Sequence, residues 1–161
     1  MLIKTIVDED FTSYKKISMV IGTIKCNGKC CIEAGIPISV CQNDEWRRMP
    51  NIDISINKII DRYLNNPMSN AIVFHGLEPF EQFEDVKMFI DILRTDYNCD
   101  DDVVIYTGYN KDEIINEVEL LSTFSNIIIK YGRYIPNDES IFDEVLGVTL
   151  ASKNQYAERI C

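Results

Sequence analysis

The feature that most constrains this chain is a dense group of cysteines. Four of its six cysteines lie within sixteen positions, at Cys26, Cys30, Cys31 and Cys41. Thiolates that are brought together repel one another and oxidise readily, so a protein that keeps them normally binds a soft cation with them. The pattern therefore predicts a metal-binding loop, and among iron–sulfur and zinc sites we favour a cluster.

The overall composition fits one domain that covers residues 1–161. With 46% hydrophobic residues, the chain can bury a sizeable core. No run approaches the roughly 18 consecutive apolar residues of a membrane span, and the start at Met1–Lys4 has no apolar stretch typical of a signal peptide. We therefore expect a cytoplasmic protein without membrane association, whose cysteines are ligands or buried thiols rather than disulfides.

The charge balance disfavours one class of partner. Sixteen basic residues stand against twenty-six acidic ones, which gives a net charge of −10. Such a surface repels a phosphate backbone, so we expect no direct binding of nucleic acid.

Apolar runs of strand length alternate with segments of helical periodicity. Strands are predicted at residues 18–24, 71–74, 103–106 and 126–130, and helices at 53–65 (with Asp53 or Ser55 as N-cap), 81–94 and 111–121. Regular alternation of this kind indicates an α/β fold with a largely parallel sheet and right-handed crossovers. The cysteine loop, the turn at residues 75–79 and the turn at 107–109 then all fall at the carboxyl ends of strands, where such sheets bind ligands.

Four motifs occur in an order that resembles a known family. The cysteine loop is followed by a Gln-Asn and a Trp (Cys41–Trp46), the second strand ends in Gly-Leu-Glu-Pro (Gly76–Pro79), the third ends in Thr-Gly-Tyr (Thr107–Tyr109), and a Gly with a later Ser-Lys-Asn-Gln closes the series (Gly147, Ser152–Gln155). The chain is similar over nearly its whole length to radical S-adenosylmethionine (radical SAM) enzymes. It most resembles the branch that activates glycyl-radical enzymes, in particular the activating proteins of anaerobic ribonucleoside-triphosphate reductases.

The resemblance implies a fold, two cofactors and a reaction. The fold would be a truncated parallel β/α barrel of about five strands, open enough to accept a loop of a partner. A 4Fe-4S cluster held by three thiolates leaves one iron for S-adenosylmethionine, which is cleaved reductively to methionine and a 5′-deoxyadenosyl radical. The radical would remove a hydrogen atom from a glycine of the partner reductase, with flavodoxin or ferredoxin as the reductant.

The third cluster ligand departs from the family spacing of Cys-x3-Cys-x2-Cys. Two-residue spacing after Cys30 falls on Glu33, so we infer an insertion of eight residues that makes Cys26, Cys30 and Cys41 the ligands. Neighbouring cysteines point apart, which disfavours Cys31 as the third ligand. Coordination by all four thiols is a further alternative, which would close a cluster or describe a zinc site.

By the same resemblance, six other residues are candidates for binding S-adenosylmethionine. Glu78 or the backbone near Gly76 would contact the methionyl ammonium, Thr107 and Tyr109 the ribose or carboxylate, and Asn154 and Gln155 the adenosine. A leucine, Leu77, replaces the second glycine of the family turn.

Each candidate also has a structural interpretation. Glu78 suits the N-terminus of the helix that follows it, Thr107 to Tyr109 suit a turn, and Asn154 with Gln155 suit a loop or cap. His75, the only histidine, is at best a neighbour of the site, and Cys99 and Cys161 receive no role.

Two other functions stay open at this stage. The chain could be a radical SAM enzyme that acts on another peptide or on a small molecule. It could also be a non-catalytic iron–sulfur or zinc module for electron transfer that uses all four clustered cysteines.

Overall fold

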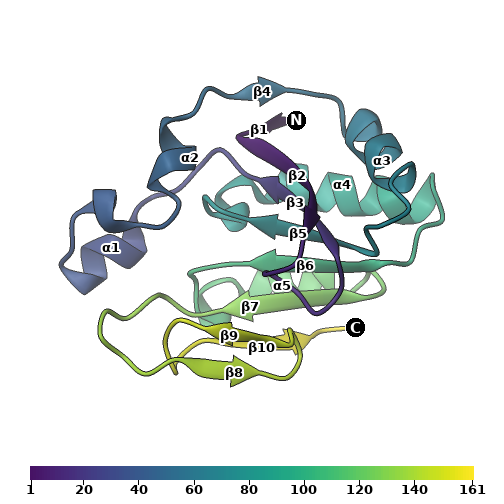
Figure 1. Ribbon diagram of the computed structural model, residues 1–161. Coiled ribbons are helices and arrows are strands. Elements are labelled where there is room, and N and C mark those ends of the chain that lie inside the picture. Colours follow the sequence, from purple (N-terminus) through teal and green to yellow (C-terminus); the bar gives the residue numbers. More distant parts are fainter.

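A computed structural model describes residues 1–161 and contains one six-stranded sheet and two two-stranded sheets, with α3, α4 and α5 packed on one face of the large sheet (Figure 1). The strands are β1 (Leu2–Ile3), β2 (Thr5–Asp10), β3 (Ser18–Gly22), β4 (Ile52–Asp53), β5 (Ala71–His75), β6 (Asp102–Tyr106), β7 (Ile127–Tyr131), β8 (Ile141–Asp143), β9 (Val148–Leu150) and β10 (Tyr156–Arg159). The helices are α1 (Lys29–Ala34), α2 (Asp44–Arg48), α3 (Ile56–Leu64), α4 (Phe83–Thr95) and α5 (Ile115–Leu121), with short 3₁₀ turns η1 (Ile38–Val40), η2 (Pro79–Gln82) and η3 (Lys111–Glu113).

The order of the sheet is β10-β7-β6-β5-β3-β2. The four central strands β3, β5, β6 and β7 are parallel and lie side by side in chain order, as the β/α alternation predicts. The edge strands β2 and β10 are antiparallel, so the sheet is mixed. Chain-order neighbours joined by helices are typical of a singly wound β/α layer, which is the arrangement found in barrels.

The predicted helices form, with shifted starts. The first begins at Ile56 with Ser55 as its N-cap, whose hydroxyl accepts from the Lys58 backbone N–H at 3.4 Å. Asp53 is not a cap, because it pairs with Leu2 in the small β1–β4 ladder. The other two begin as the 3₁₀ turns η2 and η3 before continuing as α4 and α5.

The central strands alternate between two apolar clusters. On one face, Ile72 and Phe74 of β5 pack with side chains of α3, α4 and α5 in a cluster of 21 buried residues. On the other face, Ala71 and Val73 join a smaller cluster of nine, covered by Tyr14 and the C-terminal segment. Because these strands are buried on both faces, their sequences are continuous apolar runs. Burial of each Ile or Phe side chain contributes roughly 1.5–3 kcal/mol to the stability of the fold.

The buried carboxylate of Asp102 connects separate segments on the second face of the sheet. Asp102, at the start of β6, accepts a hydrogen bond from the Tyr14 hydroxyl at 3.0 Å and pairs with Lys16 at 2.6 Å and Arg159 at 2.8 Å. Burial would raise the pKa of Asp102, but these three partners outweigh it and hold the pKa below its ordinary value of 3.8. The carboxylate thereby joins the loop before β3 and the last strand to the centre of the sheet.

We predict that Asp102→Asn lowers the free energy of unfolding by about 1–2 kcal/mol at pH 7, because it removes the buried charge that pairs with Lys16 and Arg159 and weakens the acceptor of the buried Tyr14 hydroxyl. The pKa of Asp102 is lower in the folded than in the unfolded protein. The stabilisation by its carboxylate is therefore complete above the unfolded-state pKa and is lost as the pH falls through the folded-state pKa. The difference between variant and wild type should therefore shrink between pH 5 and pH 3, as measured by urea unfolding. The exposed Asp112→Asn serves as control, and an equal loss in both variants would contradict the assignment.

Candidate functional site

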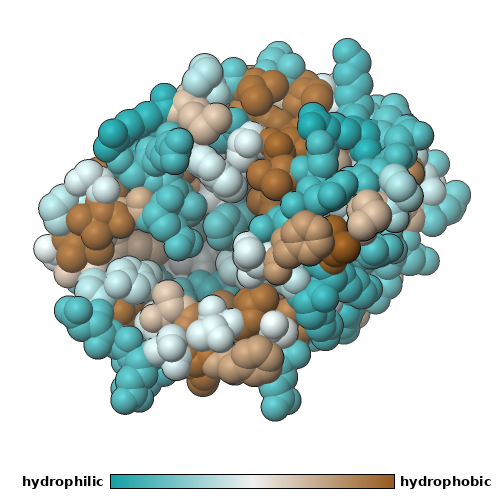
Figure 2. Space-filling model, in the orientation of Figure 1, coloured by the Kyte–Doolittle hydropathy of each residue, from teal (hydrophilic) through white to brown (hydrophobic).

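Three loops meet at one edge of the sheet. The cysteine loop follows β3, Gly76–Pro79 follows β5, and Thr107–Tyr109 follows β6. Because these strands are parallel, their carboxyl ends lie on the same side, which is the side where α1 is found (Figure 1). The same side is hollowed in the surface view, where a recess lies between the region of α1 and the body of the sheet (Figure 2).

Backbone hydrogen bonds tie the start of the cysteine loop to the turn after β5. The Leu77 N–H donates to the Thr23 carbonyl at 3.1 Å, and the Glu78 N–H donates to the Lys25 carbonyl at 2.8 Å. The buried side chain of Gln82 accepts from the Ile24 N–H at 3.0 Å. These three hydrogen bonds fix the backbone of residues 23–25, which leads into Cys26.

Glu78 is buried and its carboxylate joins two of the loops. One oxygen accepts from the Thr107 hydroxyl at 2.7 Å and from the Phe80 N–H at 3.3 Å, and the other accepts from the Gly108 N–H at 2.8 Å. Burial raises the pKa of Glu78, and these hydrogen bonds oppose that rise. Since a carboxylate has about four acceptor positions, roughly one stays available for a further donor. Glu78 is also the N-cap of η2, so it occupies the N-terminus of the helical segment that follows it.

The Thr-Gly-Tyr turn forms a compact network. Thr107 is buried, and its hydroxyl accepts from the Tyr109 N–H at 3.0 Å while donating to Glu78. The Tyr109 hydroxyl donates to Glu81 and accepts from the side-chain amide of Asn27 at 2.7 Å. Burial and the Glu81 carboxylate raise the pKa of Tyr109 well above its ordinary value, so the phenol stays protonated.

The cysteines lie on a short helix and its flanks. Cys26 is exposed before α1, Cys30 and Cys31 lie within α1, and Cys41 follows η1. Cys30 faces the turn after β6, because a Cβ placed on Gly108 would lie 2.5 Å from its Sγ. Cys31 is the buried residue of α1 and lies near Cys41 instead. The two adjacent thiols therefore point to different neighbours.

The thiols influence one another electrostatically. Burial, Glu78 and Cys26 raise the pKa of Cys30 to about 11, and burial with Glu78, Cys41 and Cys31 raises that of Cys26. Burial and Cys41 also raise the pKa of Cys31. Thiols that disfavour each other's ionisation gain most from a cation that accepts them all, so this donor set fits a soft metal centre.

No three Cys, His, Asp or Glu residues are grouped around a single metal-ion position. A 4Fe-4S cube presents separate irons to separate thiolates, so its ligands need not meet at one point. The choice of Cys26, Cys30 and Cys41, with Cys31 as alternative, stays a prediction.

A row of four residues crosses the sheet below the cysteine loop. The strand register aligns Gly22, His75, Tyr106 and Lys130 on the face opposite α3, α4 and α5. The rings of His75 and Tyr106 meet edge to face at 5.0 Å, and the Lys130 ammonium lies 6.0 Å from the Tyr106 ring centre. Burial lowers the pKa of His75 to about 4 and that of Lys130 to about 8. His75 is thus a packed neighbour of the site, as expected.

The segment after Cys41 covers this row. The Trp46 ring meets the His75 ring edge to face at 5.9 Å and lies 3.1 Å from the Cβ position of Gly22. The Asn43 side chain occupies the space beside Gly76, where a Cβ would approach it to 2.6 Å. Gly76 also has a φ of +20°, so the turn tolerates only glycine at this position.

The C-terminal motif lies at the end of β7. The Asn154 amide donates to the Arg133 carbonyl at 2.9 Å, and the Gln155 amide donates to the Gly132 carbonyl at 3.1 Å. Both side chains thus secure the turn after β7 at the same edge of the sheet as the other loops. Gly147 lies elsewhere, against Lys15 in the loop that enters β3.

Several residues of this edge were not candidates in the sequence: Asn27, Lys29, Gln82, Tyr106, Glu113, Lys130 and Arg133. A signal existed for two of them. Lys130 is the one charge in the apolar run of β7, and Arg133 follows the glycine that ends that strand.

The comparisons with known proteins agree with a cluster site. No helix has the length and apolar character that crossing a membrane requires. Neither a curated protein nor a solved structure matches the chain. The family described as "4Fe-4S single cluster domain" matches residues 25–155, which include all four clustered cysteines and every other candidate site residue. The chain therefore belongs to the 4Fe-4S single cluster domain family.

Proposed function

We propose that this 4Fe-4S protein is a radical SAM enzyme that installs a glycyl radical on a partner, an anaerobic ribonucleotide reductase. The cluster would supply one electron to the sulfonium of S-adenosylmethionine, which yields methionine and a 5′-deoxyadenosyl radical. The radical would then remove a hydrogen atom from a backbone glycine of the partner.

The observation that carries this proposal is the connection of three loops at the carboxyl edge of the sheet. The Glu78 carboxylate binds the turn after β6, and its backbone N–H binds the cysteine loop at Lys25. A protein that only held a cluster would not need the other two turns beside its cysteines. A cofactor that spans from the cluster across the ends of neighbouring strands would need them.

The residues of this edge can hold S-adenosylmethionine in an oriented way. The remaining acceptor position of Glu78 and the backbone at Gly76 suit the methionyl ammonium, since both lie beside the cysteine loop. Thr107 and Tyr109 would contact the ribose or carboxylate, and Asn154 and Gln155, whose amides bind the turn after β7, would shape the part of the edge that receives the adenosine. Trp46, packed on His75, would exclude water from the face below.

The topology also supports access by a large partner. The helices α3, α4 and α5, which connect or follow the parallel strands, all pack on one face of the sheet, as in one part of a β/α barrel. We propose that the six-stranded sheet is such a truncated barrel. A loop of the partner would reach the carboxyl edge at the recess beside α1 (Figure 2), whereas the interior of a closed barrel is filled by side chains.

One observation favours a second candidate function, that of an electron-transfer module with four protein ligands. Cys31 lies near Cys41, and Cys26 lies close enough to both that their charges raise its pKa. Four thiolates would leave no iron for S-adenosylmethionine.

The first experiment tests turnover. Anaerobically reconstituted protein with dithionite should convert S-adenosylmethionine to 5′-deoxyadenosine, and S-adenosylmethionine should alter the electron paramagnetic resonance (EPR) spectrum of the reduced cluster. Cys26→Ala should abolish both signals, while Cys99→Ala, remote from the loop, should keep them. An unchanged spectrum together with no 5′-deoxyadenosine would refute the radical SAM proposal and leave the electron-transfer module.

The second experiment identifies the third ligand. If Cys41 is the ligand, Cys41→Ala should lose iron affinity by about 10- to 100-fold or more and lose the EPR signal, while Cys31→Ala retains both. Iron content and EPR of the two variants are compared after identical reconstitution. The reverse result would assign Cys31, and loss of the cluster in both variants would indicate four-thiolate binding.

A further inference from the structure

The helix that carries Cys30 has little packing of its own. Of the six residues of α1, only Cys31 is buried, and Ile32 is 74% exposed. Its N-cap is Gly28, which offers no side-chain hydrogen bond. An isolated helix this short is not stable in water, because one turn does not offset the cost of nucleation. Other contacts must therefore hold α1 in place.

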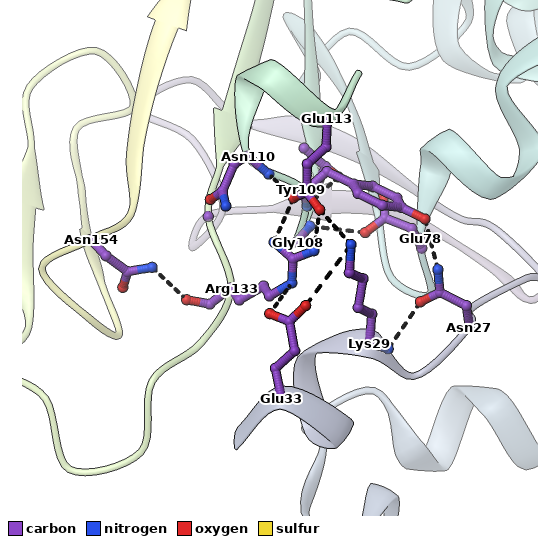
Figure 3. Close-up of polar contacts among 12 residues, drawn as sticks. Asn27, Lys29, Glu33, Glu78, Gly108, Tyr109, Asn110, Glu113, Arg133 and Asn154 are labelled. Carbon is purple, nitrogen blue, oxygen red and sulfur yellow. Dashed lines mark hydrogen bonds and ion pairs between the residues drawn. The ribbon is translucent and has the colours of Figure 1, made fainter. Parts of the chain in front are cut away.

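Asn27 contributes one such contact, because its side-chain oxygen accepts from the Lys29 N–H at 2.9 Å while its amide donates to the Tyr109 hydroxyl at 2.7 Å (Figure 3). The other contacts to the body of the protein are ionic and lie on one face of α1. Lys29 and Glu33 are four residues apart and so share a face of the helix. Lys29 pairs with Glu113, and Glu33 forms an ion pair with Arg133, whose Nε lies 2.8 Å from Glu33 Oε2 without the alignment of a hydrogen bond. Both partners belong to the body of the protein, on η3 and after β7.

The surface that receives α1 is itself firmly built. Two nitrogens of Arg133 donate to the two carboxylate oxygens of Glu113 at 2.6 and 2.7 Å, and the Asn110 N–H adds a bond at 2.9 Å. The Arg133 side chain is only 9% exposed, and its hydrogen bonds hold the pKa of Glu113 well below its ordinary range. The Tyr109 ring lies 5.8 Å from the guanidinium and 5.6 Å from the Lys29 ammonium. We call Tyr109, Glu113 and Arg133 the docking platform.

The position of α1 decides where the Cys30 thiol lies. Cys30 directly follows Lys29, and its Sγ occupies the space that a side chain at position 108 would fill. The sulfur is thus held between α1 and the turn after β6. A shift of α1 on the platform would move this thiol away from Cys26, with which it is electrostatically coupled.

We propose that the docking platform holds α1, and through it Cys30, in position to bind the cluster, with Arg133 as the positioning residue. Arg133 suits this role because its planar guanidinium contacts two carboxylates, Glu113 of the platform and Glu33 of α1. The proposal rests on Cys30 being a cluster ligand and does not require cleavage of S-adenosylmethionine.

The exposure of the pairs has a measurable consequence. Lys29 and Glu33 are 41% and 50% exposed, so their contacts with the platform are screened by salt, whereas the Arg133–Glu113 pair is more shielded. Retention of the cluster should therefore weaken as ionic strength rises.

The test compares Arg133→Met with Lys111→Met. Lys111 lies on η3 and pairs with Glu158 at 2.5 Å, so its removal deletes a nearby cation without touching α1. Iron release from anaerobically reconstituted protein to a ferrous chelator should be about tenfold faster in Arg133→Met and unchanged in Lys111→Met. Release from wild type should accelerate with added sodium chloride, and release from Arg133→Met should respond much less.

A second variant keeps the test decisive if Arg133→Met unfolds, which circular dichroism would reveal. Glu33→Gln removes only the contact on the α1 side, leaves the platform intact, and should accelerate release about threefold. Arg133→Lys should give an intermediate rate, because lysine keeps the charge but not the planar fork. Wild-type release rates in both Arg133→Met and Glu33→Gln, or salt-independent release from wild type, would overturn the proposal.

The two proposals fail separately. If these variants lose iron as expected while wild type never cleaves S-adenosylmethionine, the platform stands and the radical SAM function falls. If Cys30→Ala keeps its cluster, the platform proposal falls whatever the activity.

Discussion

The carboxyl edge of this protein depends on one buried carboxylate. The Glu78 side chain, in the turn after β5, accepts hydrogen bonds from the Thr107 hydroxyl and the Gly108 N–H. Its backbone N–H donates to the Lys25 carbonyl, in the segment that leads into the cysteine loop. A buried charge is costly unless hydrogen bonds compensate it, so the three loops and the carboxylate stabilise one another. Cys30, Thr107 and Tyr109 are positioned relative to this junction.

The parallel core of the fold could be predicted because its signal is local. The runs that became β5, β6 and β7 are continuous and apolar, and the helices between them have clear amphipathic periodicity. The edge strand β2 and the short strands β1, β4, β8, β9 and β10 were not predicted. Strands of two to four residues carry too little periodicity, and their pairing, such as that of Leu2 with Asp53, depends on contacts remote in sequence. The pairing of Asp53 with Leu2 also explains why the first predicted helix begins at Ile56 rather than at Asp53.

The sequence could predict which turns meet at the candidate site, but not the contacts that connect them. The motif positions at Glu78, Thr107 and Tyr109 do come together, because parallel strands place their ends side by side. Asn154 and Gln155 join them through the turn after β7. The ionic contacts of α1 could not be read from the sequence, since Lys29, Glu113 and Arg133 resemble ordinary surface charges until the fold brings them together.

The free edge of the sheet has a bearing on how the protein behaves in solution. Strand β2 ends in three acidic residues, Asp8–Asp10, its register with β3 shifts between Val7 and Asp10, and the Asp8 carbonyl is occupied by Asn66 and Ser69. Like charges, an irregular ladder and a covered carbonyl each discourage another strand from adding to an edge. A second molecule would meet repulsion and mismatched hydrogen bonds there, so this border resists fibril-like stacking of copies and leaves the sheet finite.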